Sequence, residues 1–454
     1  MEWPVCLDEY QKLVNRMNTP RVVLDNDVCA TATLIMVDSA RKHGALLEAV
    51  RLLTDLDLSV KKAYISSDGR WFMDVFHVTD LLGRKLADDS VRSHIEQCLG
   101  AGNDAKPDGS GGLTALELAG ANRPGLLSEV FAVLDDLRCD VVEAMVWTNR
   151  GRVASLIRVR DEEGSASPVG DSRKTRRIEG CLRNLLAVVS DRVHCAAMTA
   201  AEPCLAATRA ERRLHQMMSA DGDYERASAE AAAAPSPPPP SVSVQNWADR
   251  CYSIVNVQCR DRPKLLFDVL CALTDMECVV FHGTVDTDGD RAHQEFCIRR
   301  ADGSPIGSEA ERQRVILCLQ AAIQRRTSEG VRLELEGHRR GLLSGVTRVF
   351  RENGLSLARA EVSSKGVGGG GHVRCVFWLT DASGYPAEPG AIEAVRQRIG
   401  AAGSLKVTVP PRVPARRKPS WPGHWEEGGG VAGLLYLGSL VWRNLHNLGL
   451  IKSC

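Results

Sequence analysis

The stretch "LTALELAGANRPGLLSEVFAVLDDL", residues 113–137, contains two patterns joined at a Pro-Gly pair. Its first part alternates in the way expected of a half-buried strand. After Gly125 the apolar residues recur at helical spacing, at Leu126, Leu127, Val130, Phe131, Val133, Leu134 and Leu137. This spacing predicts a helix that buries one face against another element.

The same order, an alternating stretch followed by an amphipathic helical run, occurs four times along the chain. Gly44, Gly125, Lys264 and Gly341 occupy equivalent positions, each just before an amphipathic run. The preceding alternating stretches read "TATLIMV", "LTALELA", "YSIVNVQC" and "VRLELEG". Such internal repetition indicates one structural unit used several times, rather than one large fold.

Each copy continues with two alternating runs around a turn-forming centre, followed by a second helical run. The order strand, helix, strand, strand, helix, strand is the ferredoxin-like βαββαβ sandwich, an α+β fold with helices on one sheet face. A last strand is plain only in the second copy ("RVHCAAM") and the fourth ("LKVTV"). We therefore expect modules packed as pairs, in which neighbouring copies complete each other's sheets.

These patterns divide the chain into six parts. The expected repeats cover residues 21–100, 113–200, 250–328 and 330–410, and residues 203–243 form a connecting helix with a proline-rich linker. Residues 411–454 form a tail with an amphipathic segment, which docks on the repeats or on a partner or membrane surface. The linker, with its "PSPPPP" run, places two copies in each half of the chain.

Composition excludes several classes of protein. With 57 basic and 57 acidic residues the formal charge is zero, so no overall charge attracts DNA or anionic lipid. The 15 cysteines include no Cys-x-x-Cys pair, which favours buried thiols in a reducing compartment over disulfides or a metal site. The N-terminus lacks a signal-peptide pattern, and no apolar run reaches the ~20 residues of a membrane span. We expect a cytoplasmic protein, with the nucleus as an alternative.

The loop between first strand and first helix has the chemistry of a small-molecule site. A helix start offers unpaired N–H groups and a partial positive charge, which suit a carboxylate. The Asn122 or Asp261 side chain can cap the helix or accept a hydrogen bond from a ligand ammonium group. The competing interpretation is a cap and turn without any ligand.

These residues resemble a known signature. "NRPGLLSEVFAVLDDL" and "DRPKLLFDVLCALTDM" are similar to the Asp-Arg-Pro-Gly-Leu-Leu motif of ACT domains, which are βαββαβ regulatory modules that bind amino acids. The four-copy layout resembles the plant ACT domain repeat proteins, which are similar in turn to the glutamine-sensing region of the bacterial uridylyltransferase. The resemblance implies a non-catalytic amino-acid (nitrogen status) sensor without a cofactor, which pairs through its modules, binds glutamine or another free amino acid, and acts on a protein partner or as a homo-oligomer.

In ACT domains the ligand lies where two modules pack, held by this loop. Position by position, the resemblance implicates Asn122, Arg123, Pro124, Gly125 and Leu126 in the second copy, and Asp261, Arg262, Pro263, Lys264 and Leu265 in the third. The first and fourth copies depart from the motif, with "RKHG" at 41–44 and "HRRG" at 338–341, which leaves Gly44, Arg339 and Gly341 as secondary candidates.

Other functions have weaker signals. No convergent set of titratable residues indicates a catalytic site, and "DTDGD" (286–290) lacks the glycine and the closing Glu of a calcium loop, so we interpret it as a hairpin turn. RNA-binding RRM domains share the βαββαβ topology and stack bases on aromatic residues of the sheet. Trp71, Phe72 and Phe76 offer such residues in the first copy, so an RRM-like or purely scaffolding repeat protein is the alternative.

Overall fold

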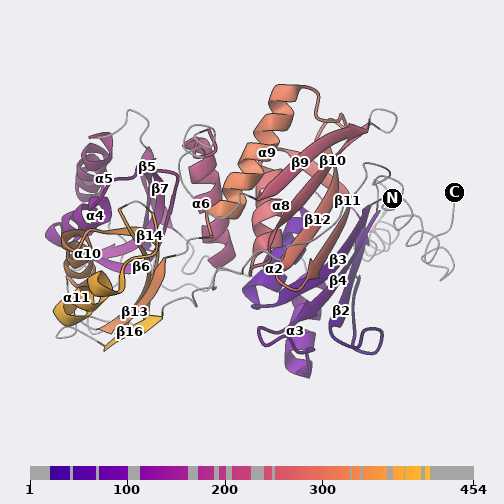
Figure 1. Ribbon diagram of the computed structural model, residues 1–454, viewed down its shortest axis with the longest axis horizontal. Coiled ribbons are helices and arrows are strands. Elements are labelled where there is room, and N and C mark those ends of the chain that lie inside the picture. The colour runs from indigo at the N-terminus through magenta and orange to yellow at the C-terminus, as the bar shows by residue number, and fades with distance from the viewer. Residues whose placement is uncertain are drawn as a thin grey trace, which may run out of the picture. The chain divides into compact units, whose positions relative to one another are not determined.

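The computed structural model describes residues 21–40, 44–67, 71–100, 113–161, 172–188, 194–200, 207–225, 240–247, 251–327, 330–337, 341–365, 372–382, 384–399 and 404–408. Within these ranges the chain folds into four α+β modules, which confirms the predicted fold class (Figure 1). The four modules are called copies 1 to 4 in chain order.

Copies 2 and 4 have the predicted βαββαβ order. Copy 2 comprises β5 (Leu113–Ala121), α4 (Leu126–Asp136), β6 (Cys139–Asn149), β7 (Arg152–Asp161), α5 (Ser172–Ala187) and β8 (His194–Ala200). Copy 4 comprises β13 (Val331–Gly337), α10 (Leu342–Glu352), β14 (Leu355–Lys365), β15 (His372–Asp381), α11 (Pro389–Ile399) and β16 (Ser404–Thr408). In both copies the last strand pairs antiparallel with the first.

Copies 1 and 3 fill the same edge of the sheet from the other end of the module. Copy 1 comprises β1 (Arg21–Asp25), β2 (Thr33–Ala40), α2 (Ala45–Asp55), β3 (Ser59–Ser67), β4 (Trp71–Thr79) and α3 (Asp89–Gly100). Copy 3 comprises β9 (Ser241–Trp247), β10 (Tyr252–Arg260), α8 (Leu265–Asp275), β11 (Cys278–Asp288), β12 (Arg291–Arg300) and α9 (Glu309–Gln324). β1 and β9 pair antiparallel with β2 and β10. The expectation that neighbouring copies supply the missing strand is therefore wrong, because each module supplies it from its own N-terminal side.

The pairing of the copies does not follow their order in the chain. One eight-stranded sheet has the order β1-β2-β4-β3-β11-β12-β10-β9, and the other has the order β16-β13-β15-β14-β6-β7-β5-β8. Copy 1 thus joins copy 3 through β3 and β11, and copy 2 joins copy 4 through β6 and β14. The modules do form pairs, but the expected division of the pairs between the two halves of the chain is wrong.

The helices of each pair cover one face of the shared sheet. In the pair of copies 2 and 4, α4, α5, α10 and α11 lie together on one side (Figure 1). Their apolar faces form one core with the strands, in which Leu134, Ile157, Ile178 and Phe377 are fully buried. The pair of copies 1 and 3 has an equivalent core around Phe76 and Phe296. Each pair is therefore a single hydrophobic unit built from two modules.

The predicted connecting helix is α6 (Ala207–Ala220), and it covers the other face of the copy 2 sheet. Ala210, Leu214, Met217 and Met218 pack there against Trp147, Ala154 and Leu156. Trp147 is wholly buried, although it lies on the sheet face opposite α4 and α5. Although the sequence of α6 looks polar, its apolar face packs on the sheet of copy 2 and forms a third hydrophobic core.

Several sequence predictions lie outside the described residues. These are the motif residues 41–43 and 338–340, which include Arg339, the proline-rich segment 226–239, and the tail 411–454. Among the described residues, no helix is both long and apolar enough to cross a membrane, and no group of His, Cys, Asp and Glu has the arrangement of a metal site.

Candidate functional site

The motif in copy 2 forms a sharp turn that ends directly at α4. Gly125 has φ +83°, and helix α4 begins at the next residue, Leu126. The Leu126 amide donates to the Arg123 carbonyl (3.2 Å), and the Asn122 amide donates to the carbonyl of Gly151 in the β6–β7 hairpin (2.8 Å). No side chain caps the helix. Of the two alternatives for Asn122, the helix cap is therefore not the one found, and the same holds for Asp261 before α8.

The left-handed turn explains the glycine of the motif. Gly44 and Gly341 have φ of +82° and +66° in front of α2 and α10. Lys264 adopts the same conformation in copy 3, with φ +65°. A side chain in this region costs on the order of 1–3 kcal/mol, so Lys264 must be held there by other contacts.

The arginine of the motif turns back onto its own helix. Arg123 donates through both terminal nitrogens to the Glu129 carboxylate, at 3.0 and 2.5 Å, and this hydrogen bonding lowers the pKa of Glu129. Arg262 contacts Asp268 at 2.7 Å through one terminal nitrogen in copy 3, and its two terminal nitrogens also donate to the carbonyls of Pro263 and Ile323. The arginine therefore fixes the loop against the first helical turn. The Nε atom of Arg123 is buried and has no hydrogen-bond partner among the described residues.

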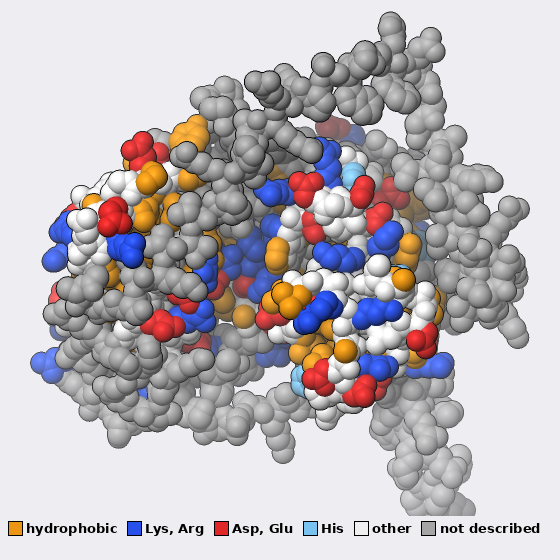
Figure 2. Space-filling view, turned by 60° about the horizontal axis from the view of Figure 1, so that its bottom comes forward, with side chains coloured by type: hydrophobic (Ala, Val, Ile, Leu, Met, Phe, Trp, Pro, Cys, Tyr) orange, Lys and Arg blue, Asp and Glu red, His pale blue; other side chains and the backbone are white. Residues whose placement is uncertain are grey.

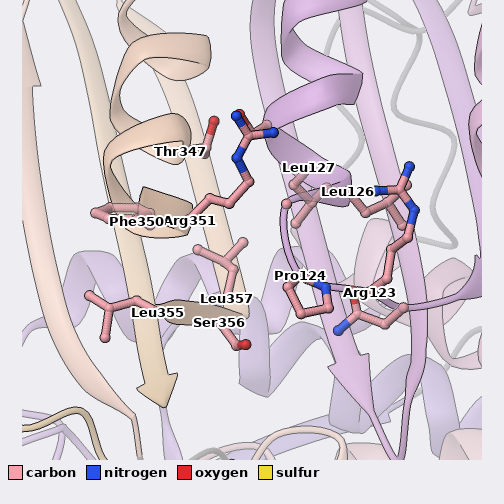
Figure 3. A pocket seen from close by; sticks show the side chains of 13 residues that line it. Arg123, Pro124, Leu126, Leu127, Thr347, Phe350, Arg351, Leu355, Ser356 and Leu357 are labelled. Atoms are coloured by element: carbon pink, nitrogen blue, oxygen red, sulfur yellow. The ribbon is translucent and has the colours of Figure 1, made fainter. Parts of the chain in front are cut away.

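A pocket lies beside this loop, at the junction of copies 2 and 4. Residues 122–128 line one side, and the other side is lined by Thr347, Phe350, Arg351 and residues 355–357 (Figure 3). All five candidate residues of copy 2 are in the lining. Leu126 also packs in the core, so it offers a ligand its backbone more than its side chain.

Arg351 lines the pocket and lies next to Gly125. It extends from the last turn of α10 toward α4 (Figure 3), and a Cβ atom on Gly125 would overlap its Cδ and lie 3.2 Å from its Cγ. Its guanidinium is 3.9 Å from the Glu129 carboxylate, and the side chain is 42% exposed. Two guanidinium groups therefore face one carboxylate here, which leaves the pocket with a surplus positive charge.

The equivalent position in copy 4 has the opposite charge. Asp135 on α4 lies over Gly341, where a Cβ atom would be 3.0 Å from its Oδ2. That oxygen also accepts a hydrogen bond from Ser344 at 3.4 Å. The copy 2 loop therefore faces an arginine, whereas the copy 4 loop faces an aspartate.

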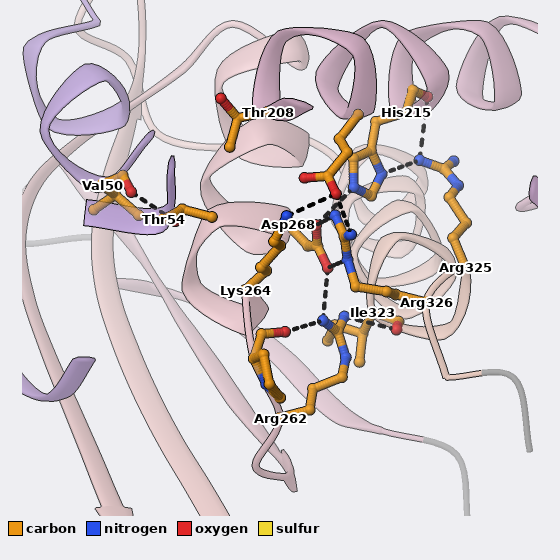
Figure 4. A network of polar contacts seen from close by, with 12 residues as sticks. Val50, Thr54, Thr208, His215, Arg262, Lys264, Asp268, Ile323, Arg325 and Arg326 are labelled. Atoms are coloured by element: carbon orange, nitrogen blue, oxygen red, sulfur yellow. Dashed lines mark hydrogen bonds and ion pairs between the residues drawn. The ribbon is translucent and has the colours of Figure 1, made fainter. Parts of the chain in front are cut away.

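The copy 3 motif lies against the chain itself. Lys264 donates to Glu211 of α6 at 2.8 Å, and Asp268 contacts Arg262, Arg326 and His215 (Figure 4). Asp261 lies 4.0 Å from Lys61 of copy 1. Pro263 is exposed, whereas Leu265 packs in the core of copies 1 and 3. The copy 3 candidates therefore lie among protein groups supplied by α6, copy 1 and copy 3 itself.

The aromatic surface considered for RNA binding is largely internal. Phe72 and Phe76 are 8% and 0% exposed and belong to the core of copies 1 and 3, and only Trp71 is exposed, at 40%. Basic and acidic side chains are interspersed on the face shown in Figure 2. "DTDGD" forms the predicted β11–β12 hairpin turn, with Gly289 at φ +58°. The geometry therefore gives little support to base stacking on copy 1.

Sequence reasoning missed the residues that approach the motif from elsewhere. Arg351 and Glu211 are far from the motif in sequence, and no local pattern marks either one. Glu129 carries a signal, since an acid recurs four residues after the loop position as Glu48, Glu129 and Asp268. That recurrence predicts a partner for the motif arginine.

Comparisons with known proteins agree with the fold and the motif. Residues 28–106 match the family described as ACR family N-terminal ACT domain, and residues 253–318 match the ACT domain. Across 99% of its length the chain is 54% identical to ACT domain-containing protein ACR8 of Arabidopsis thaliana, of which it covers 98%. It is 46% identical to ACR4 of the same plant, with 98% of each chain covered. The chain therefore belongs to the ACR family of ACT domain-containing proteins.

Proposed function

We propose that this protein is a non-catalytic regulator that binds a free amino acid in the pocket between copies 2 and 4. One observation carries the proposal: the best-preserved motif, residues 122–126, lines a pocket that a second module completes with Arg351. In this proposal the α-carboxylate pairs with Arg351 and the buried Nε of Arg123. The ligand ammonium group lies toward Glu129 and the Asn122 side chain.

A regulatory effect follows from the position of the pocket between two modules. A ligand that contacts both copies stabilises one packing of α4 against α10 over others, because it binds that arrangement more tightly. Arg351 lies across Gly125 in the structure, so the ligand must share or displace this side chain. The partly exposed Arg351 can move at small cost, since its contact with Glu129 is long.

The copy 2 loop lines a pocket that copy 4 completes. We therefore propose one amino acid per pair of copies 2 and 4. Glutamine is the first ligand to test, because of the glutamine-sensing region that the repeat layout resembles.

Thermal unfolding in the presence of each of the twenty amino acids tests this function. A ligand at one hundred times its dissociation constant stabilises the folded state by about 2.7 kcal/mol. The active compound is then compared with its α-carboxamide, which lacks the carboxylate and should stabilise far less. Arg351→Ala should abolish the effect, whereas Arg348→Ala serves as a control, because Arg348 lies on the same helix, is 64% exposed and is absent from the pocket lining. If none of the twenty gives a concentration-dependent shift, the proposal fails.

A further inference from the structure

Helix α6 lies between the two pairs of copies and contacts both with different faces. Its apolar face packs on copy 2, as described above. Its polar face points to copies 1 and 3: Thr208 donates to Asp55 at 2.8 Å, and Arg212 donates to Asp275 at 3.1 Å. Glu211 and His215 lie on this same face, since residues three, four and seven positions apart share one side of a helix. A linking helix thus presents a row of polar side chains to the helices α2 and α8.

Glu211 is the side chain of this row that reaches the copy 3 motif. Its Oε1 accepts hydrogen bonds from Lys264 and from Arg326, both at 2.8 Å. The Glu211 side chain is 1% exposed. Burial raises the pKa of this carboxyl, but Arg326 and Lys264 outweigh burial and hold the pKa below its ordinary value. Glu211 is therefore a buried, charged carboxylate whose Oε1 is held by two cations.

Lys264 is the residue that distinguishes this loop from the other copies. It occupies the position of Gly44, Gly125 and Gly341, in the left-handed conformation that favours glycine. The backbone strain is compatible with a folded protein because the ammonium group satisfies a buried carboxylate. The replacement of the motif glycine by Lys264 is therefore explained by the ion pair that Lys264 forms with Glu211.

The surrounding groups prepare the loop to hold an anion. Arg262 and Arg326 both contact Asp268, which is fully buried (Figure 4). Burial raises the pKa of Asp268, but these two arginines keep it well below the ordinary value. His215 accepts from Arg325 through Nδ1 and donates to Asp268 through Nε2, each at 2.9 Å, so it is the neutral tautomer. Burial lowers the pKa of His215 in agreement with this assignment.

We infer that the copy 3 loop is a carboxylate-binding site whose occupant is the chain's own Glu211, presented by α6. In copy 2 the same motif lines a pocket, whereas in copy 3 a tethered side chain has taken the place of a free ligand. A tethered group has an effective concentration in the millimolar range or higher, so a free amino acid competes poorly with it. The site thus fastens α6 to copy 3 and is closed to free carboxylates. This inference does not depend on amino-acid binding at copy 2.

Chemical rescue in the full-length chain tests the inference. Glu211→Ala removes a CH₂–COO⁻ group, which corresponds to acetate, and leaves Lys264 and Arg326 without their shared anion. Acetate at tenfold its dissociation constant should raise the unfolding temperature of this variant by roughly 2–4 °C. Acetamide, which has the same shape and no charge, should give no such rise. The wild type should respond to neither compound, because its site is filled.

A matched control separates this site from buried glutamates in general. Glu117 is also buried, and both of its oxygens accept from Arg213 at 2.7 Å, but Arg213 is 43% exposed. Water therefore solvates Arg213 when Glu117 is removed, and Glu117→Ala should not respond to acetate. If Glu211→Ala unfolds, its refolding yield from urea in acetate and in acetamide becomes the readout. Equal yields, or an acetate response no larger than that of Glu117→Ala, would overturn the inference.

Discussion

Substitution of alanine at Gly125 and at Gly44 separates backbone strain from the pocket contact. Both glycines precede the first helix of their copy, and their φ angles are nearly equal, at +83° and +82°. A Cβ atom at Gly44 meets no described atom within 4 Å, whereas one at Gly125 overlaps Arg351 Cδ. Gly125→Ala and Gly44→Ala therefore share the strain of a left-handed alanine, but only Gly125→Ala displaces the Arg351 side chain.

The expected magnitudes follow from this difference. Left-handed alanine costs roughly 1–2 kcal/mol at each site. Displacement of Arg351 adds less than about 1 kcal/mol, because the side chain is 42% exposed and its contact with Glu129 is 3.9 Å long. Both variants should therefore lose similar stability in urea unfolding followed by circular dichroism. Affinity for the amino acid should fall at least roughly tenfold in Gly125→Ala, since a hydrogen bond to a charged group is worth about 1.5–3 kcal/mol, and stay unchanged in Gly44→Ala.

Two results would refute this reasoning. If Gly44→Ala weakens ligand binding as much as Gly125→Ala, the ligand does not depend on the pocket beside Arg351. If Gly125→Ala loses several kcal/mol more stability than Gly44→Ala, Arg351 is a fixed structural element rather than a movable wall of the pocket.

Three further predictions concern the buried charges. Lys264→Gly relieves a strained backbone, yet it should reduce stability in urea by about 1 kcal/mol, because Glu211 then keeps only one cation; a net gain would contradict the arrangement. His215 has a lowered pKa in the fold, so its contribution to stability is complete above the unfolded pKa of about 6.5 and is lost as pH falls. Between pH 7.5 and pH 5 the wild type should therefore lose up to about 2 kcal/mol of unfolding free energy that His215→Gln does not lose. An unaltered pH profile in the variant would count against a neutral His215. Asp74 is buried, its Oδ1 has no partner among the described residues, and burial raises its pKa to about 7, so its contribution to stability is complete below the unfolded pKa of about 3.9 and is lost as pH rises to about 7. The stability gained by Asp74→Asn over the wild type should therefore be about 2–3 kcal/mol larger at pH 8 than at pH 5, and an equal gain at both would be contrary evidence.

Local patterns were sufficient for the modules but not for their connections. Apolar spacing predicted α4 and β6 because a helix and a strand each bury one face with a fixed period. The edge strands β1 and β9 escaped prediction because they precede the module, whereas the search for a missing strand looked for a last strand in the chain order. The sheet itself requires only that the edge beside the first strand be filled, and either end of the module can fill it.

The partners of each module depend on contacts that a repeat pattern does not contain. The joining strands β3, β6, β11 and β14 come from equivalent positions of the four copies, so periodicity alone cannot say which two meet. The sequence predicted α6 only as a connecting helix, because the partners of its charged residues lie far away in the chain. Glu211 and His215 are buried, and they form ion pairs and hydrogen bonds with Lys264, Asp268 and Arg326 of copy 3, which lie more than fifty positions away in the chain.

The candidate site was predictable in its loop and not in its surroundings. Positive φ at Gly125 follows from the glycine of the motif, and a pocket lies beside that turn. Arg351 and Asp135 distinguish copy 2 from copy 4, and both come from the facing helix of the other module. Their roles emerge only after the two copies are paired.

Titration calorimetry with the amino acid that stabilises the wild type tests the central claim most directly. The pocket between copies 2 and 4 predicts one binding site per chain and affinity at least tenfold weaker in Arg351→Gln, with Arg348→Gln unchanged. Two or more equal sites per chain, or full affinity in Arg351→Gln, would contradict a single amino-acid site at this pocket.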